Sequence, residues 1–133
     1  MLATLLFMIA AVQEPEIVVS RSAATPAIER ILKADNLDIE ALSPREVAER
    51  MKVIERGASP ENFWQAYQAH VRAWAAYADA VDAARKLPPG EPQPTGSEWA
   101  VGKAKTEINR TFDTVELLAR RYRARIPLPR TRI

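Results

Sequence analysis

The sequence PENFWQAYQAHVRAWAAYADAVDAARK occupies residues 60–86 and has the periodicity of one long helix. Apolar side chains recur in it at alternating steps of three and four residues, which places them on a single helical face. That face contains Trp64, Tyr67, Val71, Trp74, Ala78 and Val81, flanked by Phe63, His70 and Tyr77. Each helical residue adds about 1.5 Å, so the predicted helix is about 40 Å long.

A second stretch, residues 97–124, shows the same periodicity, and either Thr95 or Ser97 can cap its start. The segment between the two stretches, residues 87–96 (LPPGEPQPTG), contains four Pro and two Gly and cannot continue a helix. Two long amphipathic helices joined by a ten-residue loop predict an antiparallel helical hairpin. The apolar face of the second helix contains Val101, Ala104, Ile108, Phe112, Val115, Ala119, Tyr122 and Ile126.

Three dipeptides pair a helix-capping residue with Pro at the first helical position: Thr25-Pro26, Ser43-Pro44 and Ser59-Pro60. Ser43 and Glu46 also have the spacing of a capping box. These signals predict two short helices before the long pair, the second of them closed by a left-handed Gly57. The expected fold class is therefore all-α: a small helical bundle, spanning residues 25–126 and dominated by a long antiparallel hairpin of about 60–86 and 97–124.

The first twelve residues, MLATLLFMIAAV, contain no charged side chain. As a helix they would span about 18 Å, which is too short for the roughly 30 Å core of a bilayer. Residues 1–11 are therefore predicted to be a signal peptide, with Ala10-Ala11 at its cleavage region and an extended linker over residues 12–24. The signal peptide implies a periplasmic or secreted protein. The alternative, an apolar segment packed on the domain, stays open because no Lys or Arg precedes the apolar run.

Residues 16–21, with the sequence EIVVSR, form a β-branched segment that is expected to be extended. The segment resembles the TonB box near the mature N-terminus of TonB-dependent outer-membrane receptors, which adds a strand to an edge of the TonB domain. Ser20 stands where that family usually has Thr, the following Gly is absent, and no plug or barrel pattern follows. The resemblance covers six residues and implies strand addition through Ile17, Val18 and Val19, in the periplasm.

The net charge of +2 is unevenly distributed along the 133 residues. Residues 1–116 hold 13 basic and 17 acidic side chains, a balance of −4, whereas residues 117–133 hold six Arg and no acid, a balance of +6. The last seven residues, 127–133, form a basic tail that contains Pro. A basic cluster can bind a polyanion, and it can also be a solvated helix end that is favourable to the helix dipole. The cluster consists of Arg120, Arg121, Arg123, Arg125, Arg130 and Arg132.

The sequence offers little catalytic chemistry. The absence of Cys excludes disulfides and thiol catalysis, and the single His70 excludes a multi-His metal site within one chain. His70 has no carboxylate at i±3 or i±4, so a packing role is preferred to that of a catalytic base. Asp79 and Asp82 share a helical face, but Asp82 is also placed to pair with Lys86 on the surface.

These observations predict a non-enzymatic exported accessory or protein-interaction domain with an unidentified protein partner. The alternative is a peripheral binder of anionic lipid or another polyanion, acting through the Arg cluster. A small enzyme that uses His70 is the second alternative. We expect no metal, cofactor or nucleic-acid partner, since export would separate the protein from nucleic acid.

Overall fold

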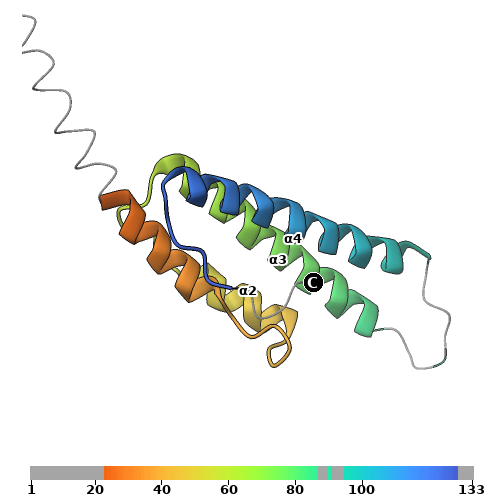
Figure 1. Ribbon diagram of the computed structural model, residues 1–133. Helices are drawn as coiled ribbons and strands as arrows, with labels where there is room; N and C mark the ends of the chain where they lie inside the picture. The colour runs from red at the N-terminus through yellow and green to blue at the C-terminus, as the bar shows by residue number, and fades with distance from the viewer. Residues whose placement is uncertain (1–22, 87–89, 91–94, 129–133) are drawn as a thin grey trace, which may run out of the picture.

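The computed structural model describes residues 23–86, 90 and 95–128, and within these ranges it contains helices and no strand. The all-α prediction is therefore confirmed for the described chain. The described helices are one over residues 23–35, α2 (Pro44–Lys52), α3 (Glu61–Arg85) and α4 (Thr95–Arg121). The two long helices, α3 and α4, lie side by side, and helix 23–35 and α2 lie below them in the view of Figure 1.

Two hydrogen bonds fix the relative direction of α3 and α4. The Tyr122 hydroxyl, just after α4, donates to Oδ1 of Asn62 in the first turn of α3 at 3.0 Å. Farther along α3, His70 lies 2.8 Å from the hydroxyl of Thr111 in α4. Because the partner's number falls as the number along α3 rises, the two helices run in opposite directions.

The start of α3 differs from the capping prediction. The capping residue is Pro60, with no side-chain cap, and the Ser59 hydroxyl is buried without a hydrogen-bond partner among the described residues. The predicted cap by Ser59 is therefore wrong. The amide of Phe63 instead bonds Oδ1 of Asn62 at 2.8 Å, which satisfies one of the free donors of the first turn.

The start of α2 follows its sequence signal, and its end does not. Ser43 accepts from the amide of Glu46, and the Glu46 carboxylate accepts from the amide of Ser43, so both halves of the capping box are present. The helix stops at Lys52, before the predicted end near Arg56. Gly57 is left-handed, with φ +58°, but it belongs to a turn in the following loop rather than to the helix end. A side chain there would also meet the Arg30 guanidinium, which donates to the Glu55 carbonyl at 2.6 Å.

Helix 23–35 extends across part of the predicted linker. Ala23 and Ala24 are helical, because Ala is the strongest helix former, so the linker does not reach residue 24. Thr25 lies inside the helix rather than at its cap, and its hydroxyl donates to the Tyr122 carbonyl at 2.7 Å. The core unites side chains from all these helices: Ile28, Ile31, Leu32, Val47, Met51, Phe63, Tyr67, Val71, Trp74, Ile108 and Val115, with alanines between them.

Candidate functional site

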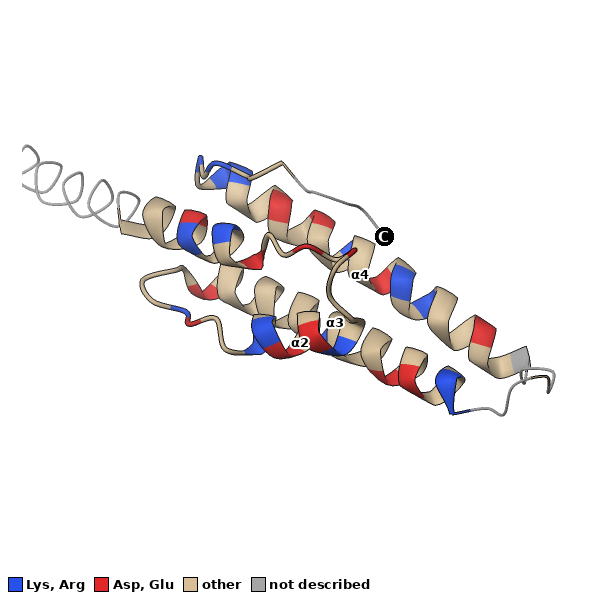
Figure 2. Ribbon diagram, turned by 90° about the horizontal axis from the view of Figure 1, so that it is seen from below, with Lys and Arg blue, Asp and Glu red and all other residues tan. Residues whose placement is uncertain are grey.

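Four arginines lie where α4 ends, and we call Arg120, Arg121, Arg123 and Arg125 the arginine end. All four are exposed. In Figure 2 the ribbon is coloured blue for Lys and Arg at that end of α4. The Arg120 guanidinium lies 3.6 Å from the Glu116 carboxylate, as the i, i+4 spacing predicts. The other two arginines of the predicted cluster, Arg130 and Arg132, lie outside the described residues.

The backbone of the arginine end forms a Schellman motif. The amide of Ala124 bonds the Ala119 carbonyl at 3.0 Å, and the amide of Arg123 bonds the Arg120 carbonyl at 3.0 Å. This motif requires a left-handed residue between helix and tail, and Arg123 fills that position with φ 56°. Glycine is the usual occupant because the left-handed conformation costs other residues about 1–2 kcal/mol. The motif ends α4 at Arg121, short of the predicted residue 124.

The segment after the motif is attached to helix 23–35. Besides the Thr25–Tyr122 bond, the amide of Arg125 donates to the Glu29 carboxylate at 3.1 Å. Ala124 is buried, and Ile126 packs against the core. The arginine end is therefore held in place by its backbone, while its side chains extend from the surface.

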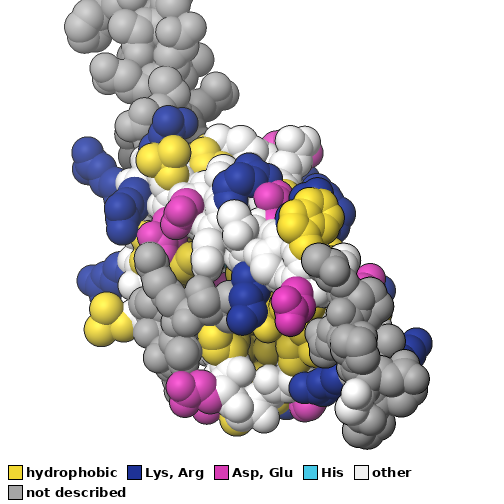
Figure 3. Space-filling model, turned by 90° about the vertical axis from the view of Figure 1, so that its right-hand side faces the viewer, with side chains coloured by type: hydrophobic (Ala, Val, Ile, Leu, Met, Phe, Trp, Pro, Cys, Tyr) yellow, Lys and Arg dark blue, Asp and Glu magenta, His cyan; other side chains and the backbone are white. Residues whose placement is uncertain are grey.

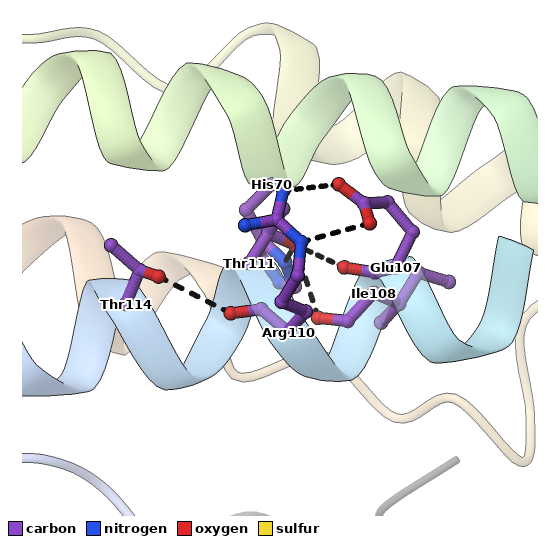
Figure 4. A network of polar contacts seen from close by, with 6 residues as sticks. All are labelled: His70, Glu107, Ile108, Arg110, Thr111 and Thr114. Carbon is purple, nitrogen blue, oxygen red and sulfur yellow. Dashed lines mark hydrogen bonds and ion pairs between the residues drawn. The ribbon is translucent and has the colours of Figure 1, made fainter.

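His70 lies in the interface between α3 and α4 and is only 3% exposed. Its Nδ1 is 2.8 Å from Oγ1 of Thr111. Figure 4 shows both residues among the polar contacts where the two helices meet. The Thr111 hydroxyl has one proton, and carbonyl oxygens of Glu107 and Ile108 lie 2.9 and 3.1 Å from it. The hydroxyl therefore donates to the backbone of α4 and accepts from Nδ1–H of His70, which fixes the neutral tautomer.

Burial lowers the pKa of His70 to about 4, although a hydrogen bond to the Ile108 backbone opposes the shift. The imidazole is thus neutral at pH 7. The ring lies beside that of Phe112, with ring centroids 5.3 Å apart and the two planes tilted by 37°. A general base must reach the proton of a substrate, and this ring is enclosed by side chains and committed to Thr111.

Asp79 and Asp82 share a face of α3, as predicted, but their partner is on another helix. Arg45, in the first turn of α2, lies 2.5 Å from Asp79 and 2.9 Å from Asp82. The hydrogen bonds to Asp79 and then to Asp82 raise the pKa of Arg45. The expected partner Lys86 is replaced by Arg45, because a guanidinium bonds both carboxylates at once and joins α2 to α3.

A second polar pair inside the bundle, Tyr67 and Asp35, is not predicted by the sequence pattern. The Tyr67 hydroxyl donates to Oδ1 of Asp35 at 3.0 Å, which ties the end of helix 23–35 to α3. Burial raises the pKa of Asp35 to about 6, and the hydrogen bond from Tyr67 partly offsets that rise. Burial, followed by the charge of Asp35, raises the pKa of Tyr67.

Two large apolar side chains remain at the surface of α4: Trp99 is 66% exposed and Leu117 is 53% exposed. The ammonium group of Lys103 lies 4.9 Å from the centre of the Trp99 ring, in a cation–π contact. Figure 3 views the molecule from the end where α3 finishes and α4 begins, and hydrophobic side chains are visible there among basic and acidic ones.

Among the described residues, no three His, Cys, Asp or Glu side chains are grouped to hold a metal ion. None of the described helices combines the length and apolar character that crossing a membrane requires. The predicted signal peptide and the Ile17–Val19 segment lie outside the described residues. Comparison with family models, curated proteins and solved structures finds no match to this chain.

Proposed function

We propose that this protein is a non-enzymatic exported interaction domain that contacts a polyanionic partner through its arginine end. In this proposal the periplasmic localisation rests on the predicted signal peptide. The hairpin of α3 and α4, with the two short helices, acts as a rigid scaffold for the contact. Arg123 is the observation that carries the proposal, because a cation occupies the left-handed position where glycine would be more stable.

The burial pattern around the arginine end also supports this function. Ala119 and Ala124 are buried and fix the backbone, whereas the neighbouring arginine side chains are exposed. A preorganised backbone lowers the entropy lost when a partner binds. The four guanidinium groups give this surface the positive charge that attracts a polyanion.

The polar groups with catalytic potential are already committed within the bundle. His70 donates to Thr111, and Asp79 and Asp82 both bond Arg45. A reaction at His70 would require the α3–α4 interface to open. These contacts favour an interaction domain over the His70 enzyme that the sequence left as an alternative.

The test is salt-dependent retention on immobilised poly-glutamate, a polyanion with no specific shape. Removing residues 117–133 would be a poor test, because Ala119 and Ala124 belong to the packed bundle. The informative variant changes Arg120, Arg121, Arg123 and Arg125 to Gln, which moves the net charge from +2 to −2. The parent should be retained at about 50 mM salt and released well below about 300 mM, since exposed charges are screened beyond about 8 Å.

A matched control variant makes the same total charge change elsewhere. Its four Gln substitutions replace exposed basic residues of α2 and α3: Arg50, Lys52, Arg72 and Arg85. We expect the arginine-end variant to lose retention and the control variant to keep most of it. Equal loss in both variants would show that net charge alone controls retention, and the proposed site would then be wrong.

A further inference from the structure

The outer face of α4 presents two large apolar side chains in line with each other. Trp99 and Leu117 are 18 residues apart, which is five full helical turns at about 100° per residue. They therefore project from the same side of the helix, about 27 Å apart along its axis. Both are more than half exposed, at 66% and 53%. Neither packs in the core formed by the inner face of α4.

The same outer face carries four cations: Lys103, Arg110, Arg120 and Arg121, all exposed. Asp113 is the carboxylate nearest the middle of the face. Three other carboxylates, Glu98, Glu107 and Glu116, lie toward its edges; Glu107 pairs with Arg110 and Glu116 pairs with Arg120. The middle of the face, which holds four cations and one carboxylate, is therefore basic, and isolated apolar side chains lie between its charges. We call this set, Trp99, Lys103, Arg110, Leu117, Arg120 and Arg121, the α4 outer face.

We propose that the α4 outer face is the surface on which this protein lies against an anionic phospholipid bilayer. This inference rests on the proposed function and names its partner, since the arginine end continues the α4 outer face. Basic side chains attract the anionic headgroups, while Trp and Leu insert among the headgroups and upper acyl chains. Trp is suited to that depth, because its ring is apolar and its indole N–H is polar.

The spacing of the apolar residues favours a membrane over an acidic protein. Hot spots of protein interfaces cluster near the centre of the contact, in desolvated pockets. Here the two apolar side chains are about 27 Å apart on one straight helix, which fits a flat and extended target. Long basic side chains can also lay their aliphatic stems on apolar surface while the charge stays in water, as the placement of Lys103 over Trp99 allows.

Co-sedimentation with vesicles tests the inference on the intact chain. The probe is phosphatidylcholine containing about 30% phosphatidylglycerol, compared with phosphatidylcholine alone. We expect binding to the anionic vesicles at about 50 mM salt, a large loss at about 300 mM, and little binding to neutral vesicles. Of the three Trp residues, Trp74 is buried, Trp64 is half-buried against the core and Trp99 is exposed, so the emission shift on binding should disappear in Trp99→Phe.

A matched pair of lysine substitutions tests whether vesicles bind the α4 outer face in particular or basic residues anywhere on α4. Lys103 and Lys105 are both exposed on α4, but at i, i+2 spacing they point to nearly opposite sides. Lys103→Gln should weaken vesicle binding about fivefold, and Lys105→Gln should change it less than twofold. Leu117→Ala should also weaken binding, whereas Val53→Ala, at an exposed site just after α2, should not.

The outcomes distinguish this inference from the proposed function. If the protein is retained on poly-glutamate through its arginine end but does not bind anionic vesicles, the proposed interaction domain stands. The proposal that the α4 outer face binds a membrane is then wrong. Equal effects of Lys103→Gln and Lys105→Gln, or an unchanged Trp99 emission, would also overturn the α4 outer face. Failure of both poly-glutamate and vesicle binding would overturn both proposals.

Discussion

The carboxylate of Asp35 accepts a hydrogen bond from the buried Tyr67 hydroxyl, 3.0 Å away, and this contact anchors helix 23–35 on α3. One helical turn farther along α3 lies His70, whose ring centroid is 6.5 Å from that of Tyr67. Burial raises the pKa of Asp35 to about 6 and lowers the pKa of His70 to about 4. Both shifts disfavour the charged form of a buried group, and they act on stability in opposite directions as the pH changes.

Replacing His70 should reveal how the titration of Asp35 changes the free energy of unfolding with pH. With its pKa raised from 3.8 to about 6, the folded state binds this proton more tightly than the unfolded state. The contribution of Asp35 therefore rises as the pH falls from about 6 to about 4. In His70→Asn, whose amide can still donate to Thr111, the free energy of unfolding should rise by about 2 kcal/mol over that range. Urea unfolding at a series of pH values measures it, and a falling curve would contradict the assignment.

Replacing Asp35 should give the opposite slope. The pKa of His70 falls from 6.5 to about 4 on folding, so the unfolded state takes up this proton first. Stability from His70 is complete above pH 6.5 and is lost as the pH falls toward 4. Asp35→Asn can still accept the hydrogen bond from Tyr67, and it should lose stability across this range while the parent stays nearly flat. Asp113→Asn, on the exposed surface of α4, is the control and should follow the parent.

Trp74→Ala should cost about 3–5 kcal/mol, because truncating a buried aromatic removes its packing and leaves a cavity. Trp74 is only 6% exposed, and its ring meets that of Tyr77 with centroids 5.8 Å apart. A domain of this size has about 5–15 kcal/mol in total, so the variant should be close to unfolding. Trp99→Ala makes the same change at a 66% exposed site and should cost less than about 1 kcal/mol. Coincident denaturant midpoints for Trp74→Ala and the parent would place Trp74 at the surface.

Arg123→Gly and Arg121→Gly should change stability in opposite directions. Arg123 has φ 56°, so glycine removes a steric cost there and should stabilise the fold by about 1 kcal/mol. Arg121 is in the last turn of α4, where glycine should cost up to about 1 kcal/mol. Thermal unfolding of both variants decides the matter. Destabilisation by Arg123→Gly would mean that its side chain contributes more to the fold than its backbone conformation costs.

The sequence predicts the helices well where the signal lies within a few residues along the chain. Residues 60–86 were predicted for α3, which is observed at Glu61–Arg85, because the apolar repeat ends in a Pro-rich segment. The capping box of Ser43 and Glu46 is present because its two bonds lie within four residues. The end of α4 was harder to predict, since Arg123 occupies a position whose usual signal is glycine.

The polar contacts of Arg45 and His70, like the bond of Arg125 to Glu29 at the arginine end, join residues far apart in the sequence, so no local pattern contains them. Arg45 meets Asp79 34 residues away, and His70 meets Thr111 41 residues away. Such pairs appear only when helices pack, and a carboxylate that can pair locally with Lys86 gives no sign that it will pair with Arg45 instead. The sequence shows that arginines cluster near its end, but it does not predict the Schellman motif that positions them.

The bond from Thr25 to the Tyr122 carbonyl spans 97 residues, and the one from Arg125 to Glu29 spans 96. The first described helix therefore receives part of its packing from nearly the last described residues. A chain emerging from the ribosome cannot make these contacts until residues 122–125 have left the exit tunnel. Until then the first described helix lacks these contacts, so it completes its packing only after α4 has been synthesised.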